Sequence, residues 1–432
     1  MVRRYRSPKI VADPICGIID ITKVLPIVET KEFQALADKR QLGMASLIFR
    51  SATHSRFVHC LGAYHATCVL TDRWFLEGII TQEERDALCV YALIHDVGHP
   101  AFSHTTEDFC GLDNDAMTVE MLTGELGGVI ASLGVNTELV IRFAKKEHPL
   151  YRAVHDKNLG TEKLDYLVRD GFYTILSRPV GVEYLRKYIY YVNEQVVIDE
   201  KVVENMLDTL TFYMKMYKEV YLRKASVIAQ RMFQKMLYHL IAAGELAPAQ
   251  LPYMTDSELI GALHQSREET VCLLYRRIFK ERNLFREGVV IRPERFASET
   301  RIADKHISVV GISQQEMSRV VDAPAFQRQN HAQLEKVECA IANAVGIPAG
   351  EVLVVPVYNP ERFKAQDVLI YGSDGALHSL RERREAHFRS MEEVAQAFTA
   401  LRVCTTQEHR GVLSAPSATA AIKDLVLSQI RS

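Results

Sequence analysis

The 432-residue sequence lacks two features that would point away from the cytoplasm. Its eight cysteines are scattered with no close CxxC pair, so we expect free thiols in a reducing compartment. No stretch is apolar for the length that spans a bilayer, and the basic start MVRRYRSPKI continues into charges and prolines. These absences predict a soluble, cytoplasmic protein without a membrane partner.

The sequence also lacks an excess of positive charge. It has 52 Lys and Arg residues against 54 Asp and Glu residues, which gives a net charge of -2. Proteins that bind duplex nucleic acid usually carry a basic face that shows in their overall charge, so nucleic acid is not the expected main partner. A balanced charge still permits positive charge inside one cleft, so a small anionic substrate fits the composition.

The order of the apolar residues predicts a mostly α fold with a smaller α+β lobe at the C-terminus. Residues 1–30 indicate short strands and turns, helical spacing dominates from 32 to about 278, and we expect that part to be all-helical. The stretch 411–421 has the composition of a linker. We expect a catalytic domain over residues 1–290 and a regulatory or oligomerisation lobe over residues 291–432, in which strands alternate with helical segments (strands 289–291, 308–312, 352–357 and 367–371; helices 330–345 and 422–430).

One short segment concentrates chemically active side chains. Residues 95–104 contain three histidines and one aspartate, and they follow a helix whose start is marked by the capping box of Thr81 and Glu84. This helix delivers His95 and Asp96 at its C-terminal end. Adjacent helical residues project about 100° apart, so both side chains reach one ion only if it lies near the helix end. Imidazole and carboxylate ligands suit Zn, Fe or Mn, and Mg when substrate phosphates add oxygens.

Two further segments carry polar residues at helical spacing. Arg56 and His59 are three residues apart and share one face, where a guanidinium can bind phosphate and an imidazole can bind metal. Glu162, Tyr166 and Asp170 recur at intervals of four residues and form a polar stripe that could line a cleft.

Each of these residues has an ordinary structural interpretation when taken alone. A single histidine on a helix is more often packed or at the surface than a ligand, and a polar stripe is usually a solvated face. Nothing but residue type recommends the other nearby histidines, which we assign structural or surface roles (His54, His65, His148 and His155). The combination of the three segments is what favours a site.

His59, then His95-Asp96, then an acidic residue before the run LDYLVRD resemble the H…HD…D signature of HD-domain phosphohydrolases. The likeness is greater to the deoxynucleoside triphosphate triphosphohydrolases of the sterile-alpha-motif/HD-domain type and their bacterial relatives, here without the sterile-alpha-motif domain. The likeness extends, in the same order, through segments 9–17, 33–43, 55–62, 94–104 and 216–224. It is weaker over residues 350–404.

The resemblance implies a metal centre and a nucleotide pocket. A divalent ion, Mn, Fe, Zn or Mg, would be held by four ligands (His59, His95, Asp96 and Glu162). The implied catalytic residues are Arg56, His99 and Asn114. The implied substrate-binding residues contact either phosphate or deoxyribose (Gln41, Leu42, His104, Lys163, Tyr166, Asp170, Tyr217 and Tyr221).

The sequence departs from the family pattern at three places. Glu162 stands where the family has a metal-binding Asp, with Asp165 as the rival ligand; we prefer Glu162 and expect Asp165→Asn to leave metal content nearly unchanged. Asn114 stands where the family has a catalytic His, and an amide cannot donate a titratable proton. Ala37, near Glu29 and Gln34, replaces an Arg that reads guanine, which argues against the family's guanine effector site.

The resemblance therefore implies hydrolysis of deoxynucleoside triphosphates to deoxynucleoside and triphosphate, under control of a nucleotide effector, by a homodimer or homotetramer. Two alternatives remain. One is an HD protein that senses dNTPs or acts as a scaffold with weak or no turnover. The other is an HD phosphodiesterase that acts on another nucleotide.

Overall fold

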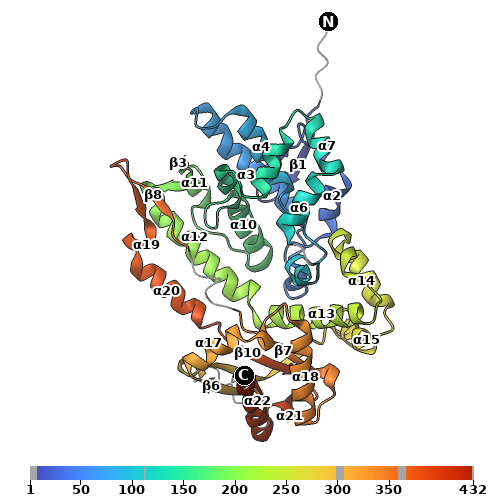
Figure 1. Ribbon diagram of the computed structural model, residues 1–432. Helices are drawn as coiled ribbons and strands as arrows, with labels where there is room; N and C mark the ends of the chain where they lie inside the picture. Colours follow the sequence, from blue (N-terminus) through green and yellow to red (C-terminus); the bar gives the residue numbers. More distant parts are fainter. Residues whose placement is uncertain (1–6, 111–112, 298–305, 359–365, 431–432) are drawn as a thin grey trace. The chain divides into compact units, whose positions relative to one another are not determined.

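The computed structural model describes residues 7–110, 113–297, 306–358 and 366–430, which form two compact units (Figure 1). The first unit comprises the described residues of Met1–Met216, Ala249–Leu259 and Ala365–Arg389. The second comprises those of Tyr217–Pro248, Ile260–Lys364 and Ser390–Ser432. Helices dominate the described chain, which confirms the mostly α fold with a smaller α+β part. The domain boundary at residue 290 stays a prediction.

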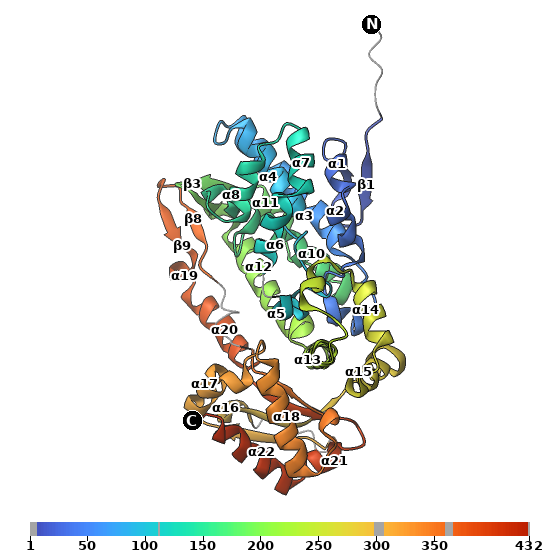
Figure 2. The same cartoon turned by 45° about the vertical axis from the view of Figure 1, so that its right-hand side comes forward.

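Three helices form the centre of the first unit: α3 (Arg56–Leu76), α4 (Gln82–Ile94) and α10 (Thr161–Ile175). Helix α3 packs against both α4 and α10, as Figures 1 and 2 show. The expected capping box is confirmed, because the Thr81 side chain accepts from the Glu84 amide and the Glu84 side chain accepts from the Thr81 amide. Every residue from Ala87 to Ile94 is buried, so the last two turns of α4 are fixed by core packing.

Further helices of the first unit surround this centre. They are α1 (Leu25–Val28), α2 (Lys31–Ala35), α5 (Glu107–Cys110), α6 (Asn114–Leu122), α7 (Glu125–Ser132), α8 (Thr137–Ala144), α9 (Arg152–His155), α11 (Val182–Arg186), α12 (Val203–Met216) and α19 (Leu380–Arg383). Among the described residues, no helix is both long enough and apolar enough to cross a membrane.

The first unit also contains two sheets. Strands β1 (Ile10–Asp13) and β2 (Gly17–Asp20) form an antiparallel hairpin. The second sheet has the order β3-β4-β8-β9, in which β4 and β8 are parallel neighbours (β3, Ile189–Val192; β4, Gln195–Asp199; β8, Leu369–Tyr371; β9, Leu377–Ser379).

The expectation of an all-helical stretch from 32 to 278 is wrong at β3 and β4. Both strands are rich in β-branched and aromatic residues, which favour extended backbone. Asn193 and Glu194 join the strands with φ values of 50° and 60°, as a tight two-residue hairpin turn requires. The strand expected at 367–371 exists as β8, but its neighbours belong to this sheet.

The second unit is built on a sheet of order β6-β5-β10-β7 (β6, Ser308–Ile312; β5, Arg286–Pro293; β10, Leu401–Thr405; β7, Val352–Val355). Its helices are α13 (Lys224–Ala242), α15 (Glu269–Tyr275), α16 (Glu294–Ala297), α17 (Gln314–Asp322), α18 (His331–Val345), α21 (Arg410–Leu413) and α22 (Pro416–Ser428). Two more helices, α14 (Asp256–Gln265) and α20 (Glu385–Gln396), contain residues of both units.

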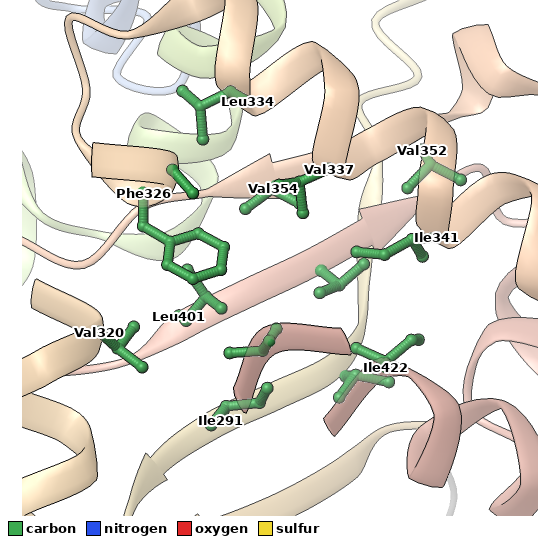
Figure 3. Close-up of a cluster of buried hydrophobic side chains, with 14 of the residues drawn as sticks. Ile291, Val320, Phe326, Leu334, Val337, Ile341, Val352, Val354, Leu401 and Ile422 are labelled. Atoms are coloured by element: carbon green, nitrogen blue, oxygen red, sulfur yellow. The ribbon is translucent and has the colours of Figure 1, made fainter. Parts of the chain in front are cut away.

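Figure 3 shows the core of this second unit. Five of its side chains are Leu334 and Ile341 of α18, Ile422 of α22 and the strand residues Val354 and Leu401, and all five are fully buried. The linker expected at 411–421 is wrong, because α21 and α22 occupy most of it. Pro416 begins α22, where the fixed φ of proline suits the first helical turn.

Candidate metal centre

The structure brings three of the expected metal ligands together inside the first unit. His59 comes from α3, whereas His95 and Asp96 directly follow α4. The Nε2 atoms of His59 and His95 are 3.2 Å apart. An Asp96 oxygen lies 3.5 Å from His95 Nε2 and another lies 3.9 Å from His59 Nε2. All three side chains are at most 5% exposed, so the cluster is a buried site.

The hydrogen bonds of the two histidines show that this donor set suits a cation. His59 Nδ1 lies 2.9 Å from Asp165 Oδ2, and His95 Nδ1 lies 2.8 Å from the Ala92 carbonyl oxygen. An ionised carboxylate and a carbonyl only accept, so each Nδ1 donates and each neutral ring keeps its lone pair on Nε2. Two such lone pairs repel each other unless a cation lies between them. Two nitrogens bound to one tetrahedral ion at roughly 2.0–2.1 Å would be about 3.3 Å apart, close to the observed separation.

Protons compete with metal for the same nitrogen of His59. Burial opposes its protonation, but the hydrogen bond and negative charge of Asp165 outweigh burial and raise the pKa of His59. A protonated Nε2 cannot bind metal, so metal affinity should fall in acid.

Glu162, in the first turn of α10, reaches the same cluster. Its Oε2 lies 3.4 Å from His95 Nε2, whereas its Oε1 lies 2.7 Å from His155 Nδ1. Burial opposes ionisation of Glu162, yet His155 and His95 lower its pKa. The carboxylate is thus placed for a fourth ligand, and that role stays a prediction. Sequence reasoning missed His155, because only the packing of α9 on α10 shows that it contacts Glu162.

Asp165 differs from Glu162 in its partners, which are Arg169 and the Nδ1 atom of His59. Its side chain is fully buried, and its two oxygens accept from Arg169 Nε and Nη2 at 2.9 Å. Oδ2 also accepts from His59 Nδ1. Burial opposes ionisation, but Arg169 and His59 hold the pKa of Asp165 well below its usual range. Asp165 therefore orients a predicted ligand, a role that sequence reasoning did not assign to it.

Arg56 and His99 lie beside Asp96. Arg56 donates from Nη1 to Asp96 Oδ2 at 2.5 Å and from Nε to Ser103 Oγ at 2.6 Å. His99 Nε2 lies 3.2 Å from Asp96 Oδ1. Burial opposes ionisation of Asp96, but Arg56 and the adjacent histidines hold its pKa well below the ordinary value. Burial and Arg56 also lower the pKa of His99 to about 3, so His99 is neutral near pH 7.

Sequence reasoning missed Lys39, a buried residue near the site. It is 2% exposed, and Nζ donates to the His99 carbonyl oxygen at 2.5 Å. Burial and the charge of Arg56 lower its pKa to about 8. Nothing in its sequence neighbourhood distinguishes Lys39 from a surface lysine.

His104 and Asn114 lie next to the cluster. The exposed ring of His104 stands edge-on to the ring of His99, with centroids 4.8 Å apart, and its Nδ1 lies 2.8 Å from Glu107 Oε2. Asn114 begins α6 and donates from Nδ2 to the His95 carbonyl oxygen at 3.1 Å. The amide of Asn114 therefore contacts the backbone of a predicted ligand.

Lys163 contacts a backbone carbonyl group and an aromatic ring. Its Nζ donates to the Lys157 carbonyl oxygen at 2.5 Å and lies 3.6 Å from the centre of the Tyr213 ring. Burial lowers its pKa to about 7. Its predicted contact with phosphate stays a prediction.

Some of the residues expected to contact the deoxyribose lie close to His59 or His54. The Tyr166 ring centre is 6.3 Å from that of His59. Asp170 Oδ1 lies 2.8 Å from His54 Nε2, and the backbone of Gln41 donates to the His54 carbonyl oxygen at 3.1 Å, next to Leu42. His54, assigned a structural role from the sequence, thus joins two of the predicted substrate residues. Tyr217 and Tyr221 belong to the second unit, in the π-helical turn Tyr217–Tyr221, so their place beside a sugar stays a prediction.

Residues 180–322 match the family model of the HD associated region. This match and the His59, His95 and Asp96 cluster make the chain similar to HD-type proteins, and among them to the deoxynucleoside triphosphate triphosphohydrolases.

Two curated proteins and one solved structure illustrate the likeness. The chain is 27% identical over 246 residues to the uncharacterized protein YwfO of Bacillus subtilis, and the aligned region covers 54% of this chain and 56% of that protein. It is 26% identical over 240 residues to the deoxynucleoside triphosphate triphosphohydrolase SAMHD1 homolog of Dictyostelium discoideum, and the aligned region covers 51% of this chain and 47% of that protein. The chain thus spans about half the length of the curated relatives it matches. A phosphohydrolase from Bacteroides thetaiotaomicron has the same fold, with a TM-score of 0.69 and 22% identity over 92% of this chain and 100% of that chain.

Proposed function

We propose that this protein is a metal-dependent phosphohydrolase that converts deoxynucleoside triphosphates to deoxynucleosides and triphosphate. The observation that carries the proposal is the 3.2 Å separation of the Nε2 atoms of His59 and His95 beside Asp96, with each Nδ1 placed against an oxygen acceptor. The choice of substrate is supported by the name of the Dictyostelium relative and by the polar residues around His59 that match the family pattern.

In this reaction water attacks the α-phosphorus, the bond from that phosphorus to the 5′-oxygen breaks, and the deoxynucleoside leaves with a proton. His59, His95, Asp96 and Glu162 would hold a divalent ion, which would supply Lewis acidity and activate water. Mn, Fe, Zn and Mg all fit this mixture of nitrogen and oxygen ligands.

The protein's own side chains orient the phosphates and move the proton. Arg56 lies against Asp96, and a guanidinium matches the geometry of phosphate oxygens. His99 is neutral near pH 7 and can donate an N–H without adding charge. Asn114 cannot supply a titratable proton, whereas His104, whose Nδ1 contacts Glu107, offers an imidazole that can.

A second candidate function is dNTP sensing with weak or no turnover. Asn114 favours it, since this side chain holds the His95 carbonyl group where the family has a catalytic histidine. A third candidate, a phosphodiesterase for another nucleotide, shares the metal chemistry but does not use the predicted sugar-binding residues.

The experiment is a panel of dNTPs and ribonucleoside triphosphates with each candidate metal, with chromatography of all products. Deoxynucleoside and triphosphate in equal amounts would support the proposal. Saturable dNTP binding without products would support the sensing function, and release of monophosphate or pyrophosphate would overturn the triphosphohydrolase assignment. The double variant His95→Ala/Asp96→Ala should lose all turnover, whereas Asp20→Asn on the exposed hairpin should retain it.

A nucleotide effector, a homodimeric or homotetrameric assembly and a cytoplasmic location are also proposals. They are supported by the resemblance and by the charge and hydropathy of the sequence.

A further inference from the structure

The turn of the N-terminal hairpin is tied to a buried arginine. Asp13 ends β1 and is only 6% exposed. Its Oδ1 accepts from the backbone amides of Ile15 and Cys16 at 2.9 and 2.8 Å, which fixes the turn. Its Oδ2 accepts from Arg169 Nη1 at 2.7 Å. The carboxylate therefore connects the backbone of the turn with a side chain of α10.

The same arginine continues the connection to the metal centre. Arg169 is fully buried and donates to both oxygens of Asp165, which accepts from His59 Nδ1. One path of charged hydrogen bonds thus runs from the hairpin turn to a predicted metal ligand. Every side chain along it is at most 6% exposed, so solvent screens these interactions little.

Gly62 provides an independent sign that this path is closely fitted to α3. It lies one turn after His59, and a Cβ placed there would be 2.1 Å from Asp165 Oδ1 and 2.4 Å from Arg169 Nη2. The pair of charged groups therefore lies directly against the helix backbone. A side chain at position 62 would displace the groups that hold His59.

We propose that Asp13 and Arg169 are positioning residues of the metal centre, so that the order of the N-terminal hairpin turn and the metal affinity of His59 are coupled. This inference rests on the proposed function, because it requires His59 to bind metal.

The coupling follows from the balance of charge. One guanidinium lies between two carboxylates, and both carboxylates share its hydrogen bonds. If Asp13 loses its charge, Arg169 interacts more strongly with Asp165, which then becomes a weaker acceptor for His59 Nδ1. A weaker acceptor makes Nε2 less basic and leaves the ring less firmly oriented, and both effects lower metal affinity.

Coupling is reciprocal, so metal binding must also stabilise the turn. The amides of Ile15 and Cys16, which donate to Asp13, should exchange with solvent more slowly when metal is bound.

The test uses the full chain and Co²⁺, whose visible absorption reports ligand geometry. Asp13→Asn keeps the shape of the side chain and an oxygen for the two amides. The control is Asp20→Asn, which makes the same change on the same hairpin, where the exposed Asp20 accepts from the Thr22 amide. We expect Asp13→Asn to weaken Co²⁺ binding by about tenfold and to change the spectrum, as partners of metal ligands do when altered. Asp20→Asn should match the wild type.

Hydrogen exchange of the peptide containing residues 10–20 gives a second measurement. Co²⁺ should slow exchange in the wild type and in Asp20→Asn, and should slow it less in Asp13→Asn. Arg169→Lys, which keeps the charge but not the two-sided hydrogen bonding, should also weaken Co²⁺ binding. If Asp13→Asn only lowers stability and leaves Co²⁺ affinity, spectrum and exchange protection unchanged, the inference is overturned and the proposed function stands. If the wild type binds no metal, both fail.

Discussion

Replacing Gly62 with alanine is the most direct test of how the metal centre is held. The added methyl group would lie 2.1 Å from Asp165 Oδ1 and 2.4 Å from Arg169 Nη2, both far inside van der Waals contact. The two clashing atoms belong to opposite partners of one buried ion pair. Rotation of a single side chain cannot relieve both contacts, so we expect the pair to separate.

The expected change in the free energy of unfolding follows from two contributions. Breaking a buried ion pair costs about 3–5 kcal/mol of the free energy of unfolding. Alanine is a better helix former than glycine and returns about 1 kcal/mol. The net destabilisation expected for Gly62→Ala is therefore about 2–4 kcal/mol. Because Asp165 also orients His59, metal affinity should fall by about 10–100-fold in the same variant.

The single tryptophan makes this measurement specific to the first unit. Trp74 lies fully buried in α3, the helix that contains Gly62, so its fluorescence during urea unfolding reports on that unit alone. The control is Gly128→Ala in α7, where an added Cβ meets nothing within 4 Å and alanine should be neutral or slightly stabilising. Stability of Gly62→Ala within about 0.5 kcal/mol of the wild type, with unchanged metal affinity, would refute this reasoning.

Three further predictions concern the ligands, the second unit and the assembly. Glu162→Gln removes an anionic oxygen 3.4 Å from His95 Nε2, and Asp165→Asn weakens the acceptor of His59 Nδ1, so both variants should bind metal more weakly in competition with a chelator. Unchanged metal affinity would exclude a ligand role for Glu162 or an orienting role for Asp165. For Asp165, this prediction replaces our sequence-based expectation that metal content stays nearly unchanged. Burial opposes ionisation of Glu335 in the second unit, but the nearby imidazole of His239 and the ammonium of Lys235 lower its pKa to about 2. Its contribution to stability should therefore be complete above the ordinary pKa of 4.5 and lost as pH falls through about 2. Glu335→Gln should flatten the acid dependence of the urea midpoint, and an equal dependence would contradict the assignment. Light scattering should give a dimer or tetramer, and a monomer with every dNTP and with GTP would contradict the proposed assembly.

The parts of the structure predicted well from the sequence depend on local signals. The capping box of Thr81 and Glu84 marks the start of α4, and the apolar run after it carries the helix to His95. Asn330 was expected to start a helix, and it caps α18 at His331–Val345. Each of these signals is contained within a few residues, so no knowledge of tertiary contacts is needed.

The parts that were missed depend on contacts between distant segments. The position of Asp165 on the helix distinguishes it from Glu162, but its hydrogen bond to His59 depends on how α3 lies against α10. The contacts of His155 with Glu162 and of His54 with Asp170 likewise follow from packing. No periodicity in the sequence distinguishes these histidines from surface residues.

The pairing of β4 with β8 has a consequence for how the chain folds. Ile198 in β4 lies beside Ile370 in β8, so a strand of the first unit finds its neighbour only after most of the chain has been synthesised. Contacts between residues so far apart in sequence slow folding. Until then β4 presents an unpaired edge, and such edges template association between chains. A fragment that ends at residue 290 would keep this edge permanently, and it should aggregate where the full chain stays dispersed.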